Sequence, residues 1–316
     1  GNNSAKQSGT GIYGHNIQQV YIKGCIFNNN RADWHGGGLY LKNLHLVQII
    51  ECIFRNCSAK DGGGAVELNL GSTIIMKINH SIFTNNSARY GGALNMKQYL
   101  TGKDKTLIQD SYFFNNSASE NGGAVSSLYC KTLYFKNSQF HHNTATSGGS
   151  VSINEAALVF NDGLYFCFNF ATGLGGSIYV WEVGTIKNNN CTFIDSKSKS
   201  HSYSLYIQCN ILINKSSIFL LSNGAIFAPN IKKVFKNIGC IFSTYKGVGT
   251  AGVNIGNVGI MFNKITLFCN NKGYNDYGGV SLNVNQKGEK VVNIKVRFIN
   301  NFGSGSAPAY SLYKVA

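Results

Sequence analysis

Four residues near the start of the chain have the types and spacing that chemistry on a sugar would need. Asp33, Trp34 and His35 are consecutive, so one short stretch offers an acid, an aromatic surface for a sugar ring and a titratable base. Asp61 supplies a second carboxylate, and hydrolysis of a glycosidic bond uses two carboxylates at one site. These four residues are the candidate ligand site that the sequence offers.

A simpler interpretation is that the acids are turn residues. Asp33 and Asp61 occupy similar places in consecutive repeats, a few residues before a glycine pair, where a carboxylate caps a turn. Carboxylates together with turn carbonyls would also suit calcium. However, the histidines fall at different places in the repeats, and the cysteines include no CxxC pair. We therefore expect no metal and no cofactor.

The elements that must position these residues follow from a repeat of about 27 residues. Most units carry an aromatic marker with an Asn three residues after it. The clearest aromatic markers are Phe27, Phe54, Phe83, Phe113 and Phe140, and the clearest Asn markers are Asn30, Asn86, Asn116 and Asn143. A glycine pair follows, as in Gly63-Gly64 and Gly91-Gly92. A fixed period of this size is typical of proteins built by stacking one unit.

Alternating apolar and polar residues in each unit, as in 65–69 and 280–284, indicate short strands. Two or three such strands per unit, joined by turns rich in Gly, Asn and Ser, predict one coil of a parallel β-helix. We therefore expect an all-β fold of about 11–12 coils, with residues 1–316 as a single domain. The aromatic rings would stack in the core, and the Asn amides would form a ladder, meaning a row of side chains bonded from coil to coil. The first residues match the middle of later units, so we expect a segment of a longer repeat protein.

The spacing of the Phe-x-x-Asn and Gly-Gly-Ala motifs resembles the repeats of the polymorphic outer membrane proteins. This family comprises bacterial autotransporter-type surface proteins, with related large surface proteins in some microbial eukaryotes. The resemblance is sharpest over residues 25–180 and again at 266–284. It implies a right-handed parallel β-helix exposed at a cell surface, commonly as part of an adhesin.

Two of the nine cysteines stand at equivalent places in consecutive units. Cys25 and Cys52 each precede the aromatic marker by two residues, and two residues along a strand return to the same face, so both side chains should point inward. We expect buried free thiols by default. Neighbouring coils would nevertheless bring this pair within the distance that allows a disulfide.

Asn-x-Ser/Thr sequons recur because the repeat itself reads Asn-Asn-Ser. If the protein is secreted from a eukaryotic cell, outward-facing sequons should carry glycans, whereas Asn residues in the inward ladder cannot. The candidates are Asn2, Asn56, Asn79, Asn85, Asn115, Asn190 and Asn214.

The net charge of +15 narrows the range of partners. The Lys residues mostly stand singly, which indicates a solvated surface, and a binding face for acidic glycans or an anionic surface is the alternative. Arg, the usual reader of base edges, is rare, so we expect no nucleic-acid partner. No uninterrupted apolar run is long enough for a transmembrane helix.

These features predict a non-catalytic, extracellular or cell-surface segment with a structural or adhesive role. Its partners would be other protein chains, copies of itself in a surface or filament assembly, or acidic glycans on a cell surface. The alternative is a carbohydrate-active or carbohydrate-binding β-helix of the pectin-lyase type, with a cleft lined by Asp33, Trp34, His35 and Asp61.

Overall fold

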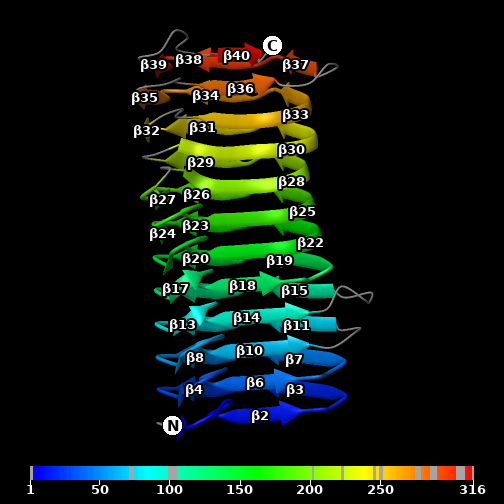
Figure 1. Ribbon diagram of the computed structural model, residues 1–316, viewed down its shortest axis with the longest axis vertical. Coiled ribbons are helices and arrows are strands. Elements are labelled where there is room, and N and C mark those ends of the chain that lie inside the picture. Colours follow the sequence, from blue (N-terminus) through cyan, green and yellow to red (C-terminus); the bar gives the residue numbers. More distant parts are fainter. Residues whose placement is uncertain are drawn as a thin grey trace.

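The protein forms one stack of coils made of strands and turns, seen in the computed structural model from its first coil to its last (Figure 1). The structure describes residues 3–70, 75–98, 105–200, 203–221, 224–244, 247–248, 252–274, 279–284, 290–303 and 310–314. These residues form strands and no helix, and every paired strand is parallel to its partner. The predicted all-β parallel β-helix with a repeat of about 27 residues is confirmed.

The aromatic markers lie in a parallel sheet of 11 strands. Consecutive coils pair in register, so that Phe27 lies opposite Phe54 and Phe54 opposite Phe83. The strands are β4 (Ile26–Asn28), β8 (Ile53–Arg55), β12 (Ile82–Thr84), β16 (Tyr112–Phe114), β20 (Gln139–His141), β23 (Tyr165–Cys167), β26 (Thr192–Ile194), β29 (Ile218–Leu221), β31 (Ile241–Thr244), β34 (Leu267–Cys269) and β38 (Arg297–Ile299). Each strand belongs to a different coil, so this sheet counts the coils.

The largest sheet has 18 strands and covers two sides of the stack. In the first coils each side has its own short strand: β2 (Ile12–His15), β6 (Leu39–Lys42), β10 (Val66–Leu70), β14 (Leu94–Gln98) and β18 (Val125–Leu128) on one side, and β3 (Gln19–Lys23), β7 (Leu46–Ile50), β11 (Ile75–Asn79), β15 (Lys105–Gln109) and β19 (Thr132–Lys136) on the other. Later coils have one long bent strand: β22 (Val151–Asp162), β25 (Ile178–Asn189), β28 (Tyr203–Lys215), β30 (Gly224–Ile238) and β33 (Val253–Lys264). The sheet ends with β36 (Val280–Val284), β37 (Lys290–Ile294) and β40 (Tyr310–Lys314).

Two narrow sheets complete the coils. One has 8 strands: β1 (Ser4–Ala5), β5 (Arg31–Ala32), β9 (Ser58–Ala59), β13 (Ser87–Tyr90), β17 (Ser117–Asn121), β21 (Thr144–Ala145), β24 (Phe170–Ala171) and β27 (Lys197–Ser198). The other has 3 strands: β32 (Gly247–Val248), β35 (Lys272–Tyr274) and β39 (Phe302–Gly303). These short strands follow the aromatic sheet and lead into the glycine turn.

The aromatic rings form one continuous stack along the core, from Phe27 to Phe298. Neighbouring ring centroids are 4.6–5.1 Å apart, and the ring planes are within 10° of parallel. Every ring from Phe54 to Phe268 in this stack is fully buried. Each ring therefore packs between the rings of the coils before and after it, and the stack ties all these coils together along the axis.

A left-handed turn precedes each aromatic strand. The residue three positions before the aromatic has a positive φ, between 46° and 63°, in each of these coils: Gly24, Glu51, His80, Asp110, Asn137, Gly163, Asn190, Ser216, Gly239, Ile265 and Lys295. A second left-handed position lies two residues after the aromatic, as at Asn56, Asn85 and Asn115. Asn tolerates this conformation better than most residues. In the Asn-Asn pair, the first Asn is therefore the turn residue and the second is the inward one.

The glycine pair lets neighbouring coils approach closely at their third corner. Gly91 has a φ of +58°, in the left-handed region that favours glycine. A Cβ on Gly92 would lie 2.2 Å from the carbonyl oxygen of Gly123 in the next coil and 2.5 Å from that of Ser117. Any larger residue at this second position would therefore push the coils apart.

The predicted Asn ladder is continuous through four coils. Asn86 donates to Asn116 Oδ1 at 3.0 Å, Asn116 donates to Asn143 Oδ1 at 3.0 Å, and Asn143 donates to Asn169 Oδ1 at 3.1 Å. Each amide also donates to the carbonyl oxygen of an aromatic in the preceding coil, as Asn116 does to Phe83 at 3.0 Å. Asn30 is buried but lies outside this ladder, because Cys57 holds the intervening place.

A second Asn ladder, which the sequence analysis missed, crosses the later coils. It joins Asn161, Asn188, Asn214, Asn237, Asn263 and Asn293, with amide-to-carbonyl distances of 2.7–2.9 Å. Each of these Asn residues stands five positions before an aromatic marker. That constant spacing is the signal that could have revealed this ladder from sequence.

Candidate functional site

Two of the four predicted ligand residues, Asp33 and Trp34, face solvent. Asp33 forms an ion pair with Lys60 at 3.2 Å, and both side chains are well exposed. Trp34 is 60% exposed. This part of the prediction therefore corresponds to a surface turn and not to the floor of a cleft.

The other two predicted residues lie together. His35 Nδ1 is 3.5 Å from Asp61 Oδ2, across two consecutive coils. Glu67 and Lys97 complete a charged cluster with them: Glu67 Oε1 is 4.0 Å from His35 Nδ1, and Lys97 Nζ is 3.9 Å from Asp61 Oδ2 and 3.8 Å from Glu67 Oε1. The cluster thus joins two carboxylates, an imidazole and an ammonium.

The strands explain why Glu67 is buried although it points away from the core. Glu67 lies in β10 between the inward residues Val66 and Leu68, and it is only 1% exposed. Asn95, opposite it in β14, donates to Glu67 Oε2 at 2.7 Å. Gly62 leaves room for this pair, since a Cβ there would be 2.3 Å from Glu67 Oε2 and 2.5 Å from Asn95 Nδ2. The missing side chain of Gly62 therefore makes space for a buried carboxylate.

Burial changes the acidity of the cluster. It raises the pKa of Glu67 from 4.5 to about 7, while the Lys97 ammonium and the Asn95 hydrogen bond oppose that rise. Burial also lowers the pKa of His35 below its usual 6.5, and the Asp61 carboxylate opposes that change. A carboxyl group that titrates near neutral pH beside an imidazole has the properties of a general acid or base.

The sequence analysis missed Glu67, Asn95 and Lys97. Each occupies an outward position of an alternating strand, which normally faces water. The useful signal was the register: Tyr40, Glu67, Asn95 and Ser126 stand directly opposite one another in consecutive coils. Glu67 is the charged residue among these four, and the other three are Tyr, Asn and Ser. This difference from its neighbours is what could have identified Glu67 from the sequence.

A hollow of about 380 Å³ lies beside the charged cluster and shares Lys97 with it. We call it the Asn95 hollow. It is lined by Tyr90, Asn95, Lys97, Asn121, Ser126, Ser127, Leu128 and Asn154. Its lining comes from β13, β14, β17, β18 and β22, so it spans three consecutive coils.

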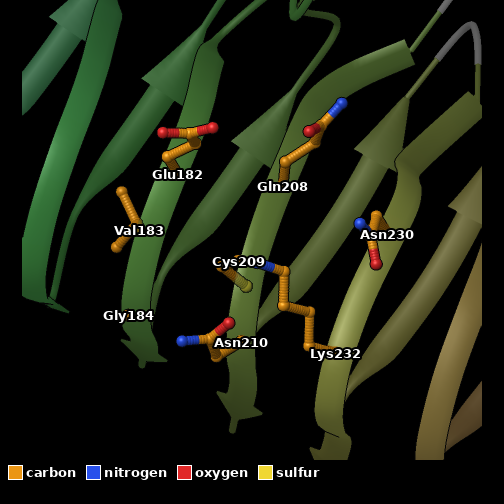
Figure 2. Close-up of a pocket in the computed structure, with 8 residues that line it drawn as sticks. All are labelled: Glu182, Val183, Gly184, Gln208, Cys209, Asn210, Asn230 and Lys232. Carbon is orange, nitrogen blue, oxygen red and sulfur yellow. The ribbon is translucent and has the colours of Figure 1, made fainter.

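A second hollow, of about 260 Å³, lies over the later coils (Figure 2). Glu182, Gln208 and Asn230 come from the neighbouring strands β25, β28 and β30, and Lys232 lies beside Cys209 (Figure 2). Burial raises the pKa of the Cys209 thiol to about 12, so it is protonated at neutral pH and unsuited to act as a nucleophile.

Within the described ranges, no group of three or more His, Cys, Asp or Glu residues is arranged to hold a metal ion. The described part of the chain also has no helix with the length and apolar character to span a membrane.

Comparison with known proteins gives a family relationship for the repeat. A model of the Chlamydia polymorphic membrane protein repeat matches residues 24–42 and 110–128. Both segments run from the aromatic strand through the glycine turn and into the next strand. Two segments of the chain therefore match this repeat. The predicted resemblance is confirmed in these segments.

A curated relative is also similar to part of the chain. It is the metabotropic glutamate receptor-like protein R of Dictyostelium discoideum, 28% identical over 189 residues that make up 57% of this chain and 11% of that protein. The chain therefore spans about a tenth of the length of this relative. No solved structure matches the chain.

Three of the predicted sequons occupy the same turn in consecutive coils. Asn56, Asn85 and Asn115 are exposed and lie two residues after the aromatic, and Asn115 donates to Asn85 Oδ1 at 2.7 Å. Asn190 is exposed at the turn that precedes an aromatic strand.

The remaining sequons differ from this group. Asn214 is fully buried in the second Asn ladder, so its side chain is inaccessible to glycosylation in the folded coil. The side chain of Asn79 is partly buried, with its Oδ1 shielded from solvent. Asn2 lies outside the described residues.

Cys25 and Cys52 are free thiols, the state that the sequence predicts by default, and no disulfide joins them. Cys25 Sγ donates to Lys23 O at 3.4 Å. Cys52 Sγ donates to Ile50 O at 3.3 Å and to Ile22 O of the preceding coil at 3.6 Å.

Proposed function

We propose that the chain is a non-catalytic, extracellular β-helix segment of a cell-surface protein, with a structural and adhesive role. The observation that supports it most is the unbroken stack of rings from Phe27 to Phe298, combined with repeats of a membrane-protein family. With neighbouring coils about 4.8 Å apart, ten steps give a rod of about 48 Å. Such a rod presents its side faces at a distance from the cell.

The partners of this rod would be other protein chains, copies of the chain lying side by side in a surface or filament assembly, or glycans of a neighbouring cell. The basic composition, with a net charge of +15, supports contact with an anionic surface. Each coil offers the same kinds of side face, so a partner can contact several coils at once.

Surface labelling and competition would test this function. An antibody against residues 1–316 should stain intact, unpermeabilised cells that make the full-length protein. The isolated segment should compete with those cells for attachment to their substrate. Staining only after permeabilisation, or attachment unaffected by excess segment, would contradict the proposal.

A second candidate function is cleavage of a polysaccharide at the charged cluster. Its support is specific: Glu67, with a pKa raised to about 7, lies near both His35 and Asp61. Against it, Glu67 is only 1% exposed and is already bonded to Asn95, which leaves a substrate little access. Loss of cleavage in Glu67→Gln, with the fold intact, would favour this enzyme function.

A further inference from the structure

We propose that the Asn95 hollow binds an uncharged sugar ring, as one unit of a neutral glycan. This proposal rests on the proposed adhesive function, since it names the class of ligand that the rod would hold. The hollow, of about 380 Å³, falls in the lower part of the roughly 300–1,000 Å³ range of small-ligand sites. Its size therefore suits a ligand of one or two rings.

The lining has the chemistry of a site for hydroxyl groups. Three amides, from Asn95, Asn121 and Asn154, lie close to the hydroxyl of Ser126. A side-chain amide offers both donors and acceptors, as does a hydroxyl, so this set can bond a ligand rich in hydroxyl groups in either direction. Leu128 and the ring of Tyr90 add apolar surface, as the faces of a sugar ring require.

One shielded polar atom of the lining lacks a hydrogen bond. Asn154 pairs with Leu128, which pairs with Lys97, so it lies in the outward row of the strands. Its Oδ1 is shielded from solvent and has no hydrogen-bond partner in the described part of the chain. An unmade hydrogen bond of a buried polar atom is costly, so this atom favours a ligand that supplies the missing donor.

The charges around the hollow favour a neutral ligand over an acidic one. Lys97 is the one formal charge among the described lining residues, and the Asp61 carboxylate, 3.9 Å away, already offsets it, with the Glu67 carboxyl group at 3.8 Å. An anionic sugar would have to approach Asp61 and Glu67 in order to reach this ammonium. A neutral sugar makes its hydrogen bonds without that repulsion.

The wall formed by Tyr90 is fixed before any ligand arrives. The guanidinium of Arg89 lies 5.1 Å from the centre of the Tyr90 ring and forms an ion pair with Glu120 at 2.7 Å. Glu120 also accepts a hydrogen bond from the Tyr90 side chain. A wall held in this way loses little conformational freedom when a ligand binds.

Binding of soluble sugars to the purified chain tests the proposal. Methyl glycosides of uncharged hexoses and N-acetylhexosamines, with methyl glucuronide for comparison, would be titrated by ligand-observed NMR and calorimetry. We expect an uncharged glycoside to bind and Asn121→Ala/Asn154→Ala to weaken it about tenfold or more, because two sites of hydrogen bonding are lost. Asn230→Ala, which alters the second hollow, is the matched control and should bind as the parent does.

The salt dependence separates the neutral ligand from an anionic one. Binding of the neutral glycoside should change little between about 0.01 M and about 1 M salt, whereas attachment through charge weakens steeply. The proposal is overturned if no uncharged glycoside binds, if the double variant binds as the parent does, or if the glucuronide binds better. Cell attachment that persists in the double variant would overturn the sugar site and leave the adhesive function standing.

Discussion

The early coils, which have separate short strands, and the late coils, which have long bent strands, fill the same corner of the core with different residues. In the early coils, the corner five positions before the aromatic is apolar, with Ile49, Ile78 and Ile108 directly opposite one another. In the late coils the same register position holds Asn188, Asn214 and Asn237, which bond to one another. The early coils instead have their amides after the aromatic, at Asn86, Asn116 and Asn143.

This exchange teaches which feature the fold requires. The aromatic stack runs through both regions without a break, while the Asn ladder moves from one side of it to the other. Separate short strands in the early coils also become long bent strands from β22 to β33. The ring stack is therefore the common element, and the polar ladder beside it varies along the stack. The last coils have both kinds, because Asn271, three residues after its aromatic, donates to Asn301 Oδ1 at 2.7 Å.

Removing a ring should have the largest effect and should be equally harmful in both regions. Phe113→Ala and Phe219→Ala each leave a cavity between two rings, so each should lower the free energy of unfolding by about 3–5 kcal/mol. Urea denaturation followed by circular dichroism measures both. If Phe219→Ala lowered the free energy of unfolding much less than Phe113→Ala does, the ring stack would not be an equally important element of both regions.

Removing an amide should cost more in the early ladder than in the late one. The side chain of Asn116 takes part in four hydrogen bonds, to Asn86, Phe83 and Asn143, whereas that of Asn214 takes part in two ladder bonds. At about 1 kcal/mol for each bond, Asn116→Ala should cost about 4 kcal/mol and Asn214→Ala about 2 kcal/mol. Equal losses in denaturation would show that the two ladders are equivalent.

The charged cluster belongs to the early coils and should give them a dependence on pH. The pKa of Glu67 is raised from 4.5 to about 7, so the folded state holds a proton that the unfolded state releases between these values. Stability from this group should therefore be full below about pH 4.5 and fall by about 3 kcal/mol as the pH rises past about 7. The lowered pKa of His35 acts in the opposite direction below pH 6.5.

Glu67→Gln isolates this contribution. Unfolding measured from pH 4.5 to pH 8 should show that the parent loses stability relative to Glu67→Gln as the pH rises. His35 is present in both proteins, so its own titration largely cancels in the difference. A difference that stays constant with pH would show that Glu67 is ionised throughout.

The smallest effect is expected at the exposed part of the predicted ligand site. Asp33→Asn removes the ion pair with Lys60, and a pair between exposed side chains contributes about 0–1 kcal/mol. The effect of Asp33→Asn on the free energy of unfolding would be compared with that of Glu67→Gln, measured at neutral pH. A loss from Asp33→Asn well above 1 kcal/mol would mean that this turn also supports the coil beneath it.

The parts of the fold that repeat a residue identity could be predicted from sequence. The aromatic stack repeats Phe, and the ladder of Asn86, Asn116 and Asn143 repeats Asn, each at a constant spacing. The pattern alone therefore indicates the structural role of both. The second ladder has an equally regular spacing, but it lies where the glycine pairs are lost.

The charged cluster could be predicted only in part, because its members come from different coils and meet only in the folded structure. His35 and Asp61 stood out by type and register, but Glu67 looks like an ordinary outward residue of a strand. Its burial depends on the missing side chain of Gly62 and on Asn95 in the next coil. Such contacts between three coils become visible only when the exact register is known.

One adhesion measurement tests the central claim, that this β-helix holds a surface partner without cleaving it. Beads coated with residues 1–316 would be applied to surfaces carrying neutral polysaccharide, acidic polysaccharide or matrix protein, and the released sugar ends would be counted. The account predicts that beads are retained on at least one surface and that no sugar ends are released. Release of sugar ends by the parent chain, absent in Glu67→Gln, would contradict it.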